Sequence, residues 1–290
     1  MRYTSSTDTN RWVGLLLIVI SAAAFGTLPI FTRLAYAAGA DPTTVLLLRF
    51  AIAAGVMILV MVVRRIRFPS GRVLLGLVLM GGLGYVGQSL SYFTALTMVS
   101  AGLVALLLYL YPAIVTVLSA ILFKERLTPV KVGALLLALV GTALTVQPGG
   151  GGRTLGIIFG IAAAVIYSIY ILVGSHLMPR TGAIASSTTV MLAAAIVYLA
   201  IVGVHGPIFP RTTPGWIAIL AIALVSTVLP IVTFFAGLSR VGPTRASTIS
   251  TFEPVVTVVL AALILGENIN ALQLIGGFLI LVAAVICSVT

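Results

Sequence analysis

Two charged residues lie deep inside apolar stretches of the sequence, where an isolated charge is costly. Glu253 is the one charge in a run that continues to Leu265, and Arg49 lies seven residues after Pro42 in another run. Ionisable side chains in such surroundings usually pair with one another or mark a pathway for protons or substrates. The chemistry to expect is therefore proton exchange or the anchoring of a polar substrate. The alternative is a buried ion pair that holds the fold together.

The two charges are expected to lie at similar depths if both runs cross a membrane. At 1.5 Å per residue, Arg49 lies about 10 Å below one surface, and Glu253, eight residues after Arg245, lies about 12 Å above the other. A hydrocarbon core of about 30 Å then leaves about 8 Å of depth between them, within reach of a long arginine. We predict two arrangements for Glu253: ionised and paired with Arg49, or protonated and open to a cavity where a proton exchanges for substrate.

A second group of candidates combines tyrosines with small polar side chains. Tyr85, Gln88, Ser89 and Tyr92 are spaced so that they share one face of a helix. Such a stripe should turn away from lipid, toward a cavity or toward a helix to which its hydroxyls bond. Other residues that could line the same cavity are Tyr167, Ser168, Tyr170, Ser226, Thr227 and Thr233. The predicted substrate-binding residues are Arg49, Tyr85, Gln88, Tyr92, Tyr167, Tyr170 and Glu253, with Glu253 also the coupling group.

Other chemistries have little support in the sequence. His176 and His205 have no partner at metal-ligand spacing, so no metal is expected. The glycine run at 149–152 lacks the Lys-Ser/Thr ending of a phosphate-binding loop, so no nucleotide cofactor is expected. An intramembrane enzyme is disfavoured because the sequence has neither H-E-x-x-H nor G-x-S-x-G.

Composition places the chain in a membrane. Hydrophobic residues make up 61% of the 290 residues and charged residues 7%, against about 25% charged in soluble domains. The net charge of +11 would suggest nucleic acid in a soluble protein, but here the basic residues lie between apolar runs. We therefore predict an all-α polytopic membrane protein that binds no nucleic acid.

The apolar residues divide into ten runs, each near the roughly 20 residues that a helix needs to cross a bilayer. Continuous rather than alternating apolar character favours helices over a barrel. The first run resembles a signal peptide, but its apolar stretch exceeds the typical 7–15 residues, so we interpret it as an uncleaved helix. The predicted spans are 12–32, 43–63, 73–96, 101–123, 130–147, 154–174, 184–204, 216–238, 246–265 and 271–289.

Helix-start signals support these boundaries. Asp41 and Thr128 each precede a proline and are predicted to cap the helices that follow. Asn270, with Gln273 three residues later, predicts a capping box. Prolines inside runs are expected to kink helices or free backbone carbonyls, and they are Pro29, Pro112, Pro230 and Pro254. Close helix packing within the chain is expected at Gly81, Gly84, Gly87, Gly156 and Gly160.

The distribution of basic residues predicts orientation. With the N-terminus inside, twelve Lys and Arg residues fall on the inner side and three on the outer side. This bias matches the rule that cytoplasmic loops are basic. Both termini are therefore predicted to be cytoplasmic, with the protein in the inner (plasma) membrane.

The two halves of the chain repeat. The segment 110–127 aligns without gaps with 252–269, so that Pro112 falls on Pro254 and Glu125 on Glu267; we call this constant displacement the repeat offset. Both glutamates are interpreted as capping and turn residues. Five spans in each half mean that the second half, 149–290, enters the membrane the opposite way up from the first, 1–148. Inverted repeats are typical of secondary transporters, whose substrate site lies between the halves near the midplane.

The repeated segments resemble the EamA family of the drug/metabolite transporter superfamily. The resemblance rests on "FKERLTPVKVGALLLALVG" ending at 141, "LGENINALQLIGGFLILVA" ending at 283, and "LLLRFAIAA" beginning at 46. It covers nearly the whole chain. It implies a ten-helix fold that exports small metabolites, often amino acids or drugs, and it does not specify the cargo.

The predicted function is export of a small metabolite by alternating access, driven by a proton or exchange gradient. The alternative is an antiporter of phosphorylated or nucleotide-type metabolites, which would need clustered cations in the cavity. A channel is disfavoured because charge rings are not evident. The tyrosine-rich runs favour neutral or aromatic cargo. The expected partners are a small-molecule substrate and the lipid bilayer, with the protein a monomer or homodimer.

Overall fold

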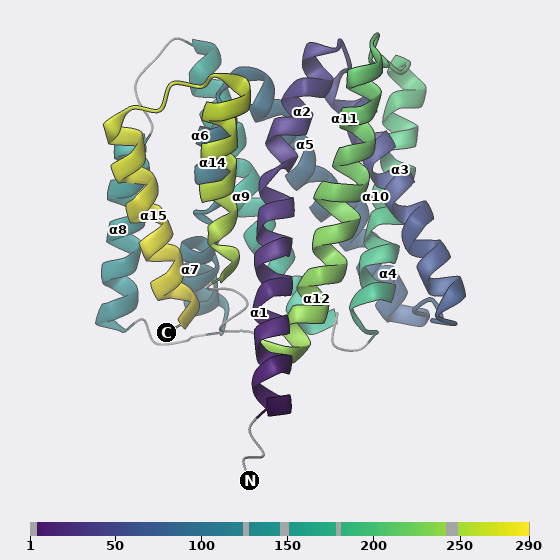
Figure 1. Cartoon of the computed structure of the whole chain (residues 1–290), viewed down its shortest axis with the longest axis horizontal. Coiled ribbons are helices and arrows are strands. Elements are labelled where there is room, and N and C mark those ends of the chain that lie inside the picture. Colours follow the sequence, from purple (N-terminus) through teal and green to yellow (C-terminus); the bar gives the residue numbers. More distant parts are fainter. Residues whose placement is uncertain (1–4, 124–127, 146–150, 178–180, 242–248, 290) are drawn as a thin grey trace.

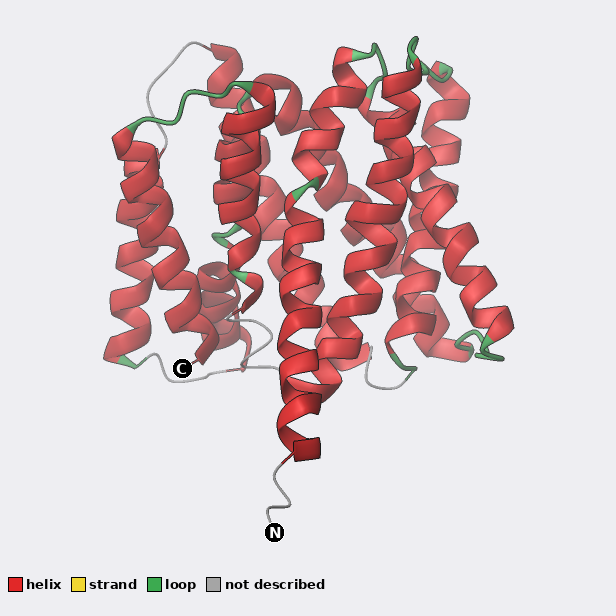
Figure 2. Cartoon of the chain, in the orientation of Figure 1, coloured by secondary structure: helices red, strands yellow, loops and turns green. Residues whose placement is uncertain are grey.

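In the computed structural model, the described residues are 5–123, 128–145, 151–177, 181–241 and 249–289. All regular structure within these ranges is helical (Figure 2), which confirms the predicted all-α class. Most helices run roughly parallel to one another, from the top to the bottom of the view in Figure 1. The beginning of the first helix and the end of the last lie at the same end of the molecule.

The described helices fall into two sets, one on each side of residue 148. The first set is α1 (Ser5–Gly26), α2 (Leu28–Ala37), α3 (Pro42–Val63), α4 (Gly71–Leu79), the π-helical segment η1 (Met80–Tyr85), α5 (Val86–Met98), α6 (Ala101–Leu108), α7 (Tyr111–Phe123) and α8 (Pro129–Thr145). The second set is α9 (Gly151–Leu177), α10 (Ala183–His205), α11 (Thr213–Ala223), the π-helical segment η3 (Leu224–Val228), α12 (Leu229–Val241), α14 (Phe252–Leu265) and α15 (Ala271–Val289).

Helical stretches long and apolar enough to cross a membrane number seven among the described residues. Three shorter apolar helices coincide with the predicted fifth, ninth and tenth spans, and they are Pro129–Leu144, Phe252–Leu265 and Ala271–Ile286. Large apolar side chains remain exposed on the outside of the molecule, as on Leu263 (77%) and Leu83 (71%). Lipid rather than water is the solvent that suits such a surface.

Several predicted spans are broken into two helices, and a proline follows most breaks. The second residue of α2, α7 and α12 is a proline in each case, namely Pro29, Pro112 and Pro230. Proline has no N–H to donate to the preceding turn and its ring displaces the backbone there. A change of helix therefore accompanies each of these three prolines, and Pro254 likewise lies in the first turn of α14, just after a turn at Thr251.

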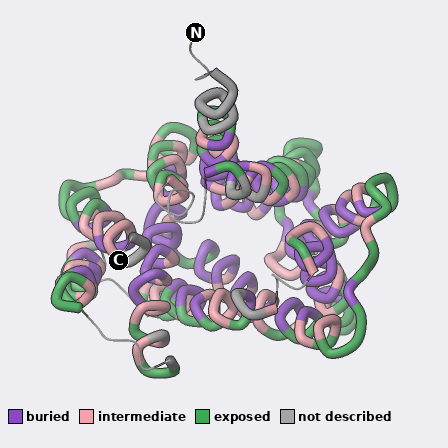
Figure 3. The backbone as a smooth tube through the Cα atoms, turned by 90° about the horizontal axis from the view of Figure 1, so that it is seen from below, coloured by how far each residue is buried: buried purple, intermediate pink, exposed green. Residues whose placement is uncertain are grey.

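Helices from the two sets pack against each other rather than forming two separate bundles. The most extensive pairs are α8 with α15, α1 with α12, α3 with α10, and α5 with α9. Under the repeat offset, α1 corresponds to α9 and α5 to α12, so the α1–α12 and α5–α9 contacts are equivalent. The α3–α10 and α8–α15 contacts each join an element to its own equivalent. Figure 3 shows buried residues on the inward sides of the helices.

Glycines permit the closest approaches between the sets. A methyl group on Gly81 would overlap the carbonyl oxygen of Val190, and one on Gly160 would lie 2.8 Å from Leu107. Gly156 approaches Met98 equally closely. The predicted packing role of these glycines within the chain is confirmed.

The predicted helix starts are also confirmed. Asp41 accepts hydrogen bonds from the backbone N–H groups of Thr43 (3.0 Å) and Thr44 (3.2 Å) at the start of α3. Thr128 caps α8 through the N–H of Lys131. The capping box at α15 consists of two reciprocal backbone-to-side-chain bonds between Asn270 and Gln273.

Candidate functional site

Arg49 lies on α3 with only 3% of its surface exposed. Its Nε donates to the hydroxyl of Thr227, 3.0 Å away in η3. The guanidinium also lies 5.0 Å from the centre of the Phe50 ring and 5.5 Å from that of Phe93. Aromatic faces attract a cation without neutralising it. The charge of Arg49 is thus held in place by neutral groups.

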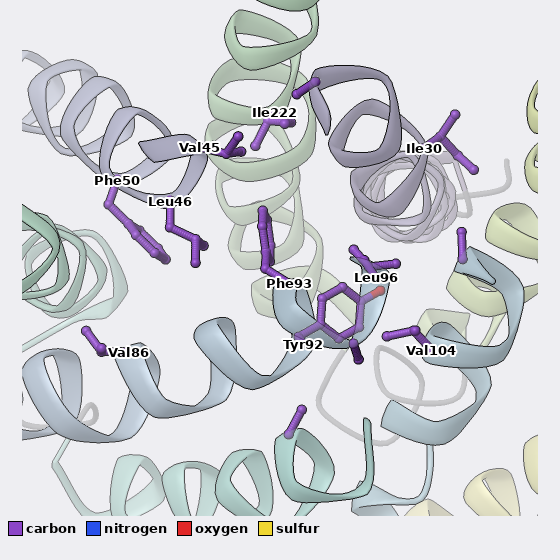
Figure 4. Packing of buried hydrophobic residues seen from close by; sticks show 14 of the residues in the cluster. Ile30, Val45, Leu46, Phe50, Val86, Tyr92, Phe93, Leu96, Val104 and Ile222 are labelled. Carbon is purple, nitrogen blue, oxygen red and sulfur yellow. The ribbon is translucent and has the colours of Figure 1, made fainter. Parts of the chain in front are cut away.

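Aromatic side chains from α3 and α5 surround this charge. Figure 4 shows Phe50 of α3 and Phe93 of α5 directed into the same interior, with Tyr92 next to Phe93. Phe50 and Phe93 are fully buried, and Tyr92 is nearly so. The Tyr92 ring lies 6.2 Å from that of Phe93, so it adjoins a ring over which Arg49 lies.

Glu253 lies in the first turn of α14 and is held by a tyrosine. The hydroxyl of Tyr109 donates to Glu253 Oε2 at 3.1 Å and to the carbonyl oxygen of Ser250 at 2.7 Å. Glu253 is half-buried, so part of its surface is accessible.

The predicted ion pair between Arg49 and Glu253 is not formed in this structure. Arg49 is engaged by Thr227 and two rings, and Glu253 by Tyr109. The packing explains the separation, because α3 lies against α10 and α11, whereas α14 lies against α1, α6 and α2. Depth along a helix, which the sequence gives, does not determine which helices are neighbours.

A row of tyrosines leads away from Glu253. The Tyr109 ring lies 5.7 Å from that of Tyr111, which lies 5.0 Å from that of Tyr167, both in edge-to-face contact. Tyr167 stacks on Tyr170 at 6.0 Å, one turn further along α9. Contacts of this geometry are favourable beyond the apolar area that they bury.

The row continues to Arg49 through the third predicted span. Tyr170 stacks on Tyr85 of η1 at 5.4 Å, and Tyr85 meets Phe50 edge-on at 5.3 Å. Phe50 is the ring over which Arg49 lies. An unbroken chain of aromatic contacts therefore joins the two buried charges. Its members, from Glu253 to Arg49, are Tyr109, Tyr111, Tyr167, Tyr170, Tyr85 and Phe50; we call them the aromatic row.

The structure brings together most of the predicted site residues. Tyr85, Tyr167 and Tyr170 are members of the aromatic row, and Tyr92 adjoins Phe93, which Arg49 contacts. Gln88 is buried on α5, and none of the hydrogen bonds described for the chain joins it to the row.

The hydroxyl residues predicted to line the cavity have mixed roles. Thr227 holds Arg49, whereas Ser226 bonds to Thr27 at 2.7 Å and Thr233 bonds back to its own helix. Ser168 donates to the backbone carbonyl of Tyr111 at 3.2 Å. Ser226 and Thr233 therefore fit the alternative interpretation, in which their hydroxyls bond within the helix packing instead of lining a cavity.

Tyr109, Tyr111 and Phe50 were missed in the sequence. One signal could have identified Tyr111, because the repeat offset aligns it with Glu253 as it aligns Pro112 with Pro254. Phe50 adjoins Arg49, but an aromatic residue in an apolar run is ordinary. Nothing in the sequence distinguishes it from a core residue.

Two π-helical segments hold site residues at equivalent places. Tyr85 ends η1, and Thr227, its equivalent under the repeat offset, lies in η3. The Thr227 hydroxyl donates to the carbonyl oxygen of Ile222, five residues earlier, at 2.8 Å. A π-bulge re-aims the side chains of one turn and is frequent at functional sites. Both segments therefore turn a polar side chain into the region between the halves.

Comparison with known proteins identifies the family. The model of the EamA-like transporter family matches residues 12–147 and again 154–289, two matches related by the repeat offset. The chain is 29% identical over 280 residues to YcbK, an uncharacterized transporter of Bacillus subtilis, covering 91% of this chain and 88% of that protein. It is also 29% identical to an uncharacterized transporter of Archaeoglobus fulgidus over 94% of this chain and 95% of that one.

Two further similarities are more distant. The aromatic amino acid exporter YddG of Ancylobacter novellus is 26% identical over 183 residues, which cover 61% of this chain and 63% of that protein. A solved crystal structure matches 97% of this chain and 96% of its own with a TM-score of 0.64 and 22% identity, a likeness of fold alone. Because the family model covers nearly all of the sequence, the chain belongs to the EamA-like transporter family and is a multi-pass membrane protein.

Proposed function

We propose that this protein exports small neutral or aromatic metabolites of amino-acid type, by alternating access between two inverted five-helix repeats. The observation that carries the proposal is the aromatic row, which joins Glu253 to Arg49 through helices of both halves. A binding site shared by two repeats is what alternating access requires, because rocking one repeat against the other exposes it to each side in turn.

Ten crossings are the proposed topology. The seven long apolar stretches and three shorter apolar helices together correspond to the ten predicted spans. Helices shorter than about 20 residues can cross where the bilayer thins around them. The equivalence of the α1–α12 and α5–α9 contacts supports two related halves. The excess of basic residues on one side supports cytoplasmic termini in the inner membrane.

The site suits a zwitterion that carries an apolar or aromatic side chain. Arg49 can accept a carboxylate, since its Nε is bonded only to the neutral Thr227 and guanidinium groups recognise carboxylates well. The tyrosine faces can accept the ammonium group. The aromatic row offers surface for the side chain. The name of the distant relative from Ancylobacter novellus, an aromatic amino acid exporter, supports the same class of cargo.

Glu253 is the proposed coupling group. The only hydrogen bond described for its carboxylate comes from a neutral hydroxyl, so a proton can be added or removed without breaking an ion pair. In the opposite state of the cycle Glu253 and Arg49 would approach each other, and the carboxylate would release its proton. Exchange of this proton for substrate would link export to the proton gradient.

An antiporter of phosphorylated metabolites is the second candidate, and the charges of the site disfavour it. Among the described residues, Arg49 is the one basic side chain that is buried. Phosphate groups usually require several cations or backbone donors. A single arginine fits a single carboxylate better.

Counterflow in liposomes tests the proposal. Purified protein is reconstituted in parallel batches that contain a high internal concentration of unlabelled phenylalanine, leucine or glucose 6-phosphate, and uptake of the same compound in labelled form is measured. We expect saturable uptake of the two amino acids and none of the sugar phosphate. Uptake of the sugar phosphate alone would favour the antiporter. An unsaturable flux that follows the membrane potential would identify a channel and contradict the proposal.

A further inference from the structure

The last two helices leave an opening toward the membrane. Although α14 and α15 are consecutive, α15 packs along α8, whereas α14 packs on α1 and α6. In Figure 1 both helices lie at the front of the molecule with α15 beside α8. The short connection through Gly266, whose φ of +65° requires glycine, permits this divergence.

Two cavities occupy the space between α14 and α15. The first, of about 230 Å³, is bounded by α6, α14 and α15, and the second, of about 620 Å³, by α1, α14 and α15. Val255, Phe278 and Leu281 line both, so the two cavities adjoin each other; together we call them the lateral groove. At 1.5 Å per residue, the stretch of α15 from Gln273 to Ile286 is about 20 Å long. This length exceeds the hydrocarbon thickness of one bilayer leaflet, about 15 Å, so the groove is long enough for an acyl chain.

The groove is apolar along its length and polar at one end. Its walls are aliphatic and aromatic, and rim residues such as Phe278 (66%) and Val259 (49%) are exposed on the lipid-facing surface. The polar end holds Ser100, Glu267 and Gln273. Glu267 accepts hydrogen bonds from the N–H groups of Ala101 and Gly102 at the start of α6, at 2.7 and 3.2 Å, and a side of it remains accessible.

We propose that the lateral groove binds one acyl chain of a bilayer phospholipid whose head group carries an ammonium group. The groove opens sideways into the bilayer, where acyl chains are the available apolar occupant. The carboxylate of Glu267 complements an ammonium group and disfavours a purely anionic head group. The side chain of Gln273 is fixed by its capping box with Asn270, and its amide nitrogen is left to donate to ester or phosphate oxygens.

Native mass spectrometry of the detergent-solubilised full chain tests this site. The protein is incubated with phosphatidylethanolamine or phosphatidylglycerol, and retained lipid is counted. The variants Val258→Trp and Val259→Trp fill the groove, the second from its exposed rim so that folding is spared. Leu263→Trp is the matched control, because it lies on the same helix with 77% exposure and outside the groove.

We expect the wild type and Leu263→Trp to retain phosphatidylethanolamine, with about ten-fold weaker binding in the two groove variants. Equal retention by groove variants and control would overturn the site. Equal retention of phosphatidylglycerol and phosphatidylethanolamine would overturn the head-group assignment. A dimer in the wild type that Val259→Trp dissociates would show that a second copy covers the groove, and would also overturn the proposal.

Discussion

Glu253 and Tyr109 form the contact on which the proposed coupling depends. The carboxylate is bound by one neutral hydroxyl, and the same hydroxyl also bonds to the backbone of Ser250. Tyr109 therefore connects the side chain of Glu253 to the turn that precedes α14. A change in the protonation of Glu253 would alter the hydrogen bonds of Tyr109 and so act on that turn, where a helix of the second half begins.

Glu253→Gln preserves the size of the side chain and its acceptor oxygen but removes ionisation. We expect the variant to fold and to perform counterflow of phenylalanine at a rate within about two-fold of wild type, since exchange needs no net proton movement. Transport driven by an imposed pH gradient should be lost. Both rates are measured in the same liposomes, so that counterflow is the internal control. Gradient-driven flux at the wild-type rate would show that Glu253 has a structural role only.

Arg49→Met removes the guanidinium while filling much of its volume. The loss of Arg49 does not leave Glu253 without a partner, because Glu253 is bonded to Tyr109. Thr227 also keeps its hydrogen bond to the carbonyl oxygen of Ile222. We therefore expect a modest loss of stability, about 1–2 kcal/mol. Affinity for phenylalanine should fall by roughly ten- to a hundred-fold, the value of a charge-assisted hydrogen bond.

Thr227→Val is the matched control for Arg49→Met. It keeps the charge and removes only the hydroxyl that orients it, so affinity should fall less, by about two- to ten-fold. Ligand-dependent thermal shifts in detergent measure both. If the two variants lose affinity equally, the hydroxyl rather than the charge recognises the cargo.

Sequence reasoning at the residue scale identified the charges but not their partners. The cost of burying a charge in an apolar run is independent of the fold, so Arg49 and Glu253 were recognisable. The partner of each depends on which helices are neighbours, and depth along a helix does not determine that. Tyr109 was missed for this reason, although three of the six members of the aromatic row were predicted.

Helix starts were well predicted because they depend on a few adjacent residues, and Asp41 is the clearest case. Burial raises the pKa of its carboxyl, but hydrogen bonds from Thr43 and Thr44 outweigh this and leave the pKa below its usual value. A carboxyl with a lowered folded-state pKa contributes stability above its unfolded pKa of about 4. That contribution is lost as the pH falls through the folded-state value.

Asp41→Ala should cost about 1 kcal/mol of stability at pH 7, the usual value of an N-cap. The difference from wild type should shrink as the pH falls from about 5 toward 3, where the wild-type carboxyl becomes protonated. Asp41→Asn is the control, because asparagine caps the helix without titrating. Thermal unfolding in detergent measures all three proteins. A difference between Asp41→Ala and wild type that is constant over this pH range would contradict the assigned ionisation.

The π-helical segments η1 and η3 could not have been predicted from the sequence. One extra residue in a turn leaves no pattern in an apolar run, and the glycines of η1 were interpreted as a packing face. Their equivalence under the repeat offset becomes visible only once the structure is known. The division of predicted spans at Pro29, Pro112 and Pro230, in contrast, follows from proline chemistry alone.

Across the whole molecule, the two halves are interleaved rather than adjacent. The sequence repeat predicted related halves with a site between them, and the pairs α1–α12, α5–α9 and α3–α10 show how they meet. Pairing of helices between halves is not encoded in hydrophobicity, because every span is apolar on most of its surface. Each half contributes to the aromatic row, and neither half alone contains both Arg49 and Glu253.

The proposed inversion of the halves has a direct topological consequence. Residues related by the repeat offset should lie on opposite sides of the membrane, and Arg67 and Phe209 are such a pair, both exposed in described loops. In a Cys287→Ser background, we expect Arg67→Cys to be protected from a membrane-impermeant thiol reagent in intact cells and Phe209→Cys to be labelled. Permeabilisation should expose Arg67→Cys, which controls for reactivity. Labelling of both positions in intact cells would mean that the repeats are parallel. The helices that carry the equivalent residues Glu253 and Tyr111 would then cross the membrane in the same direction. Alternating access between inverted repeats would have no basis.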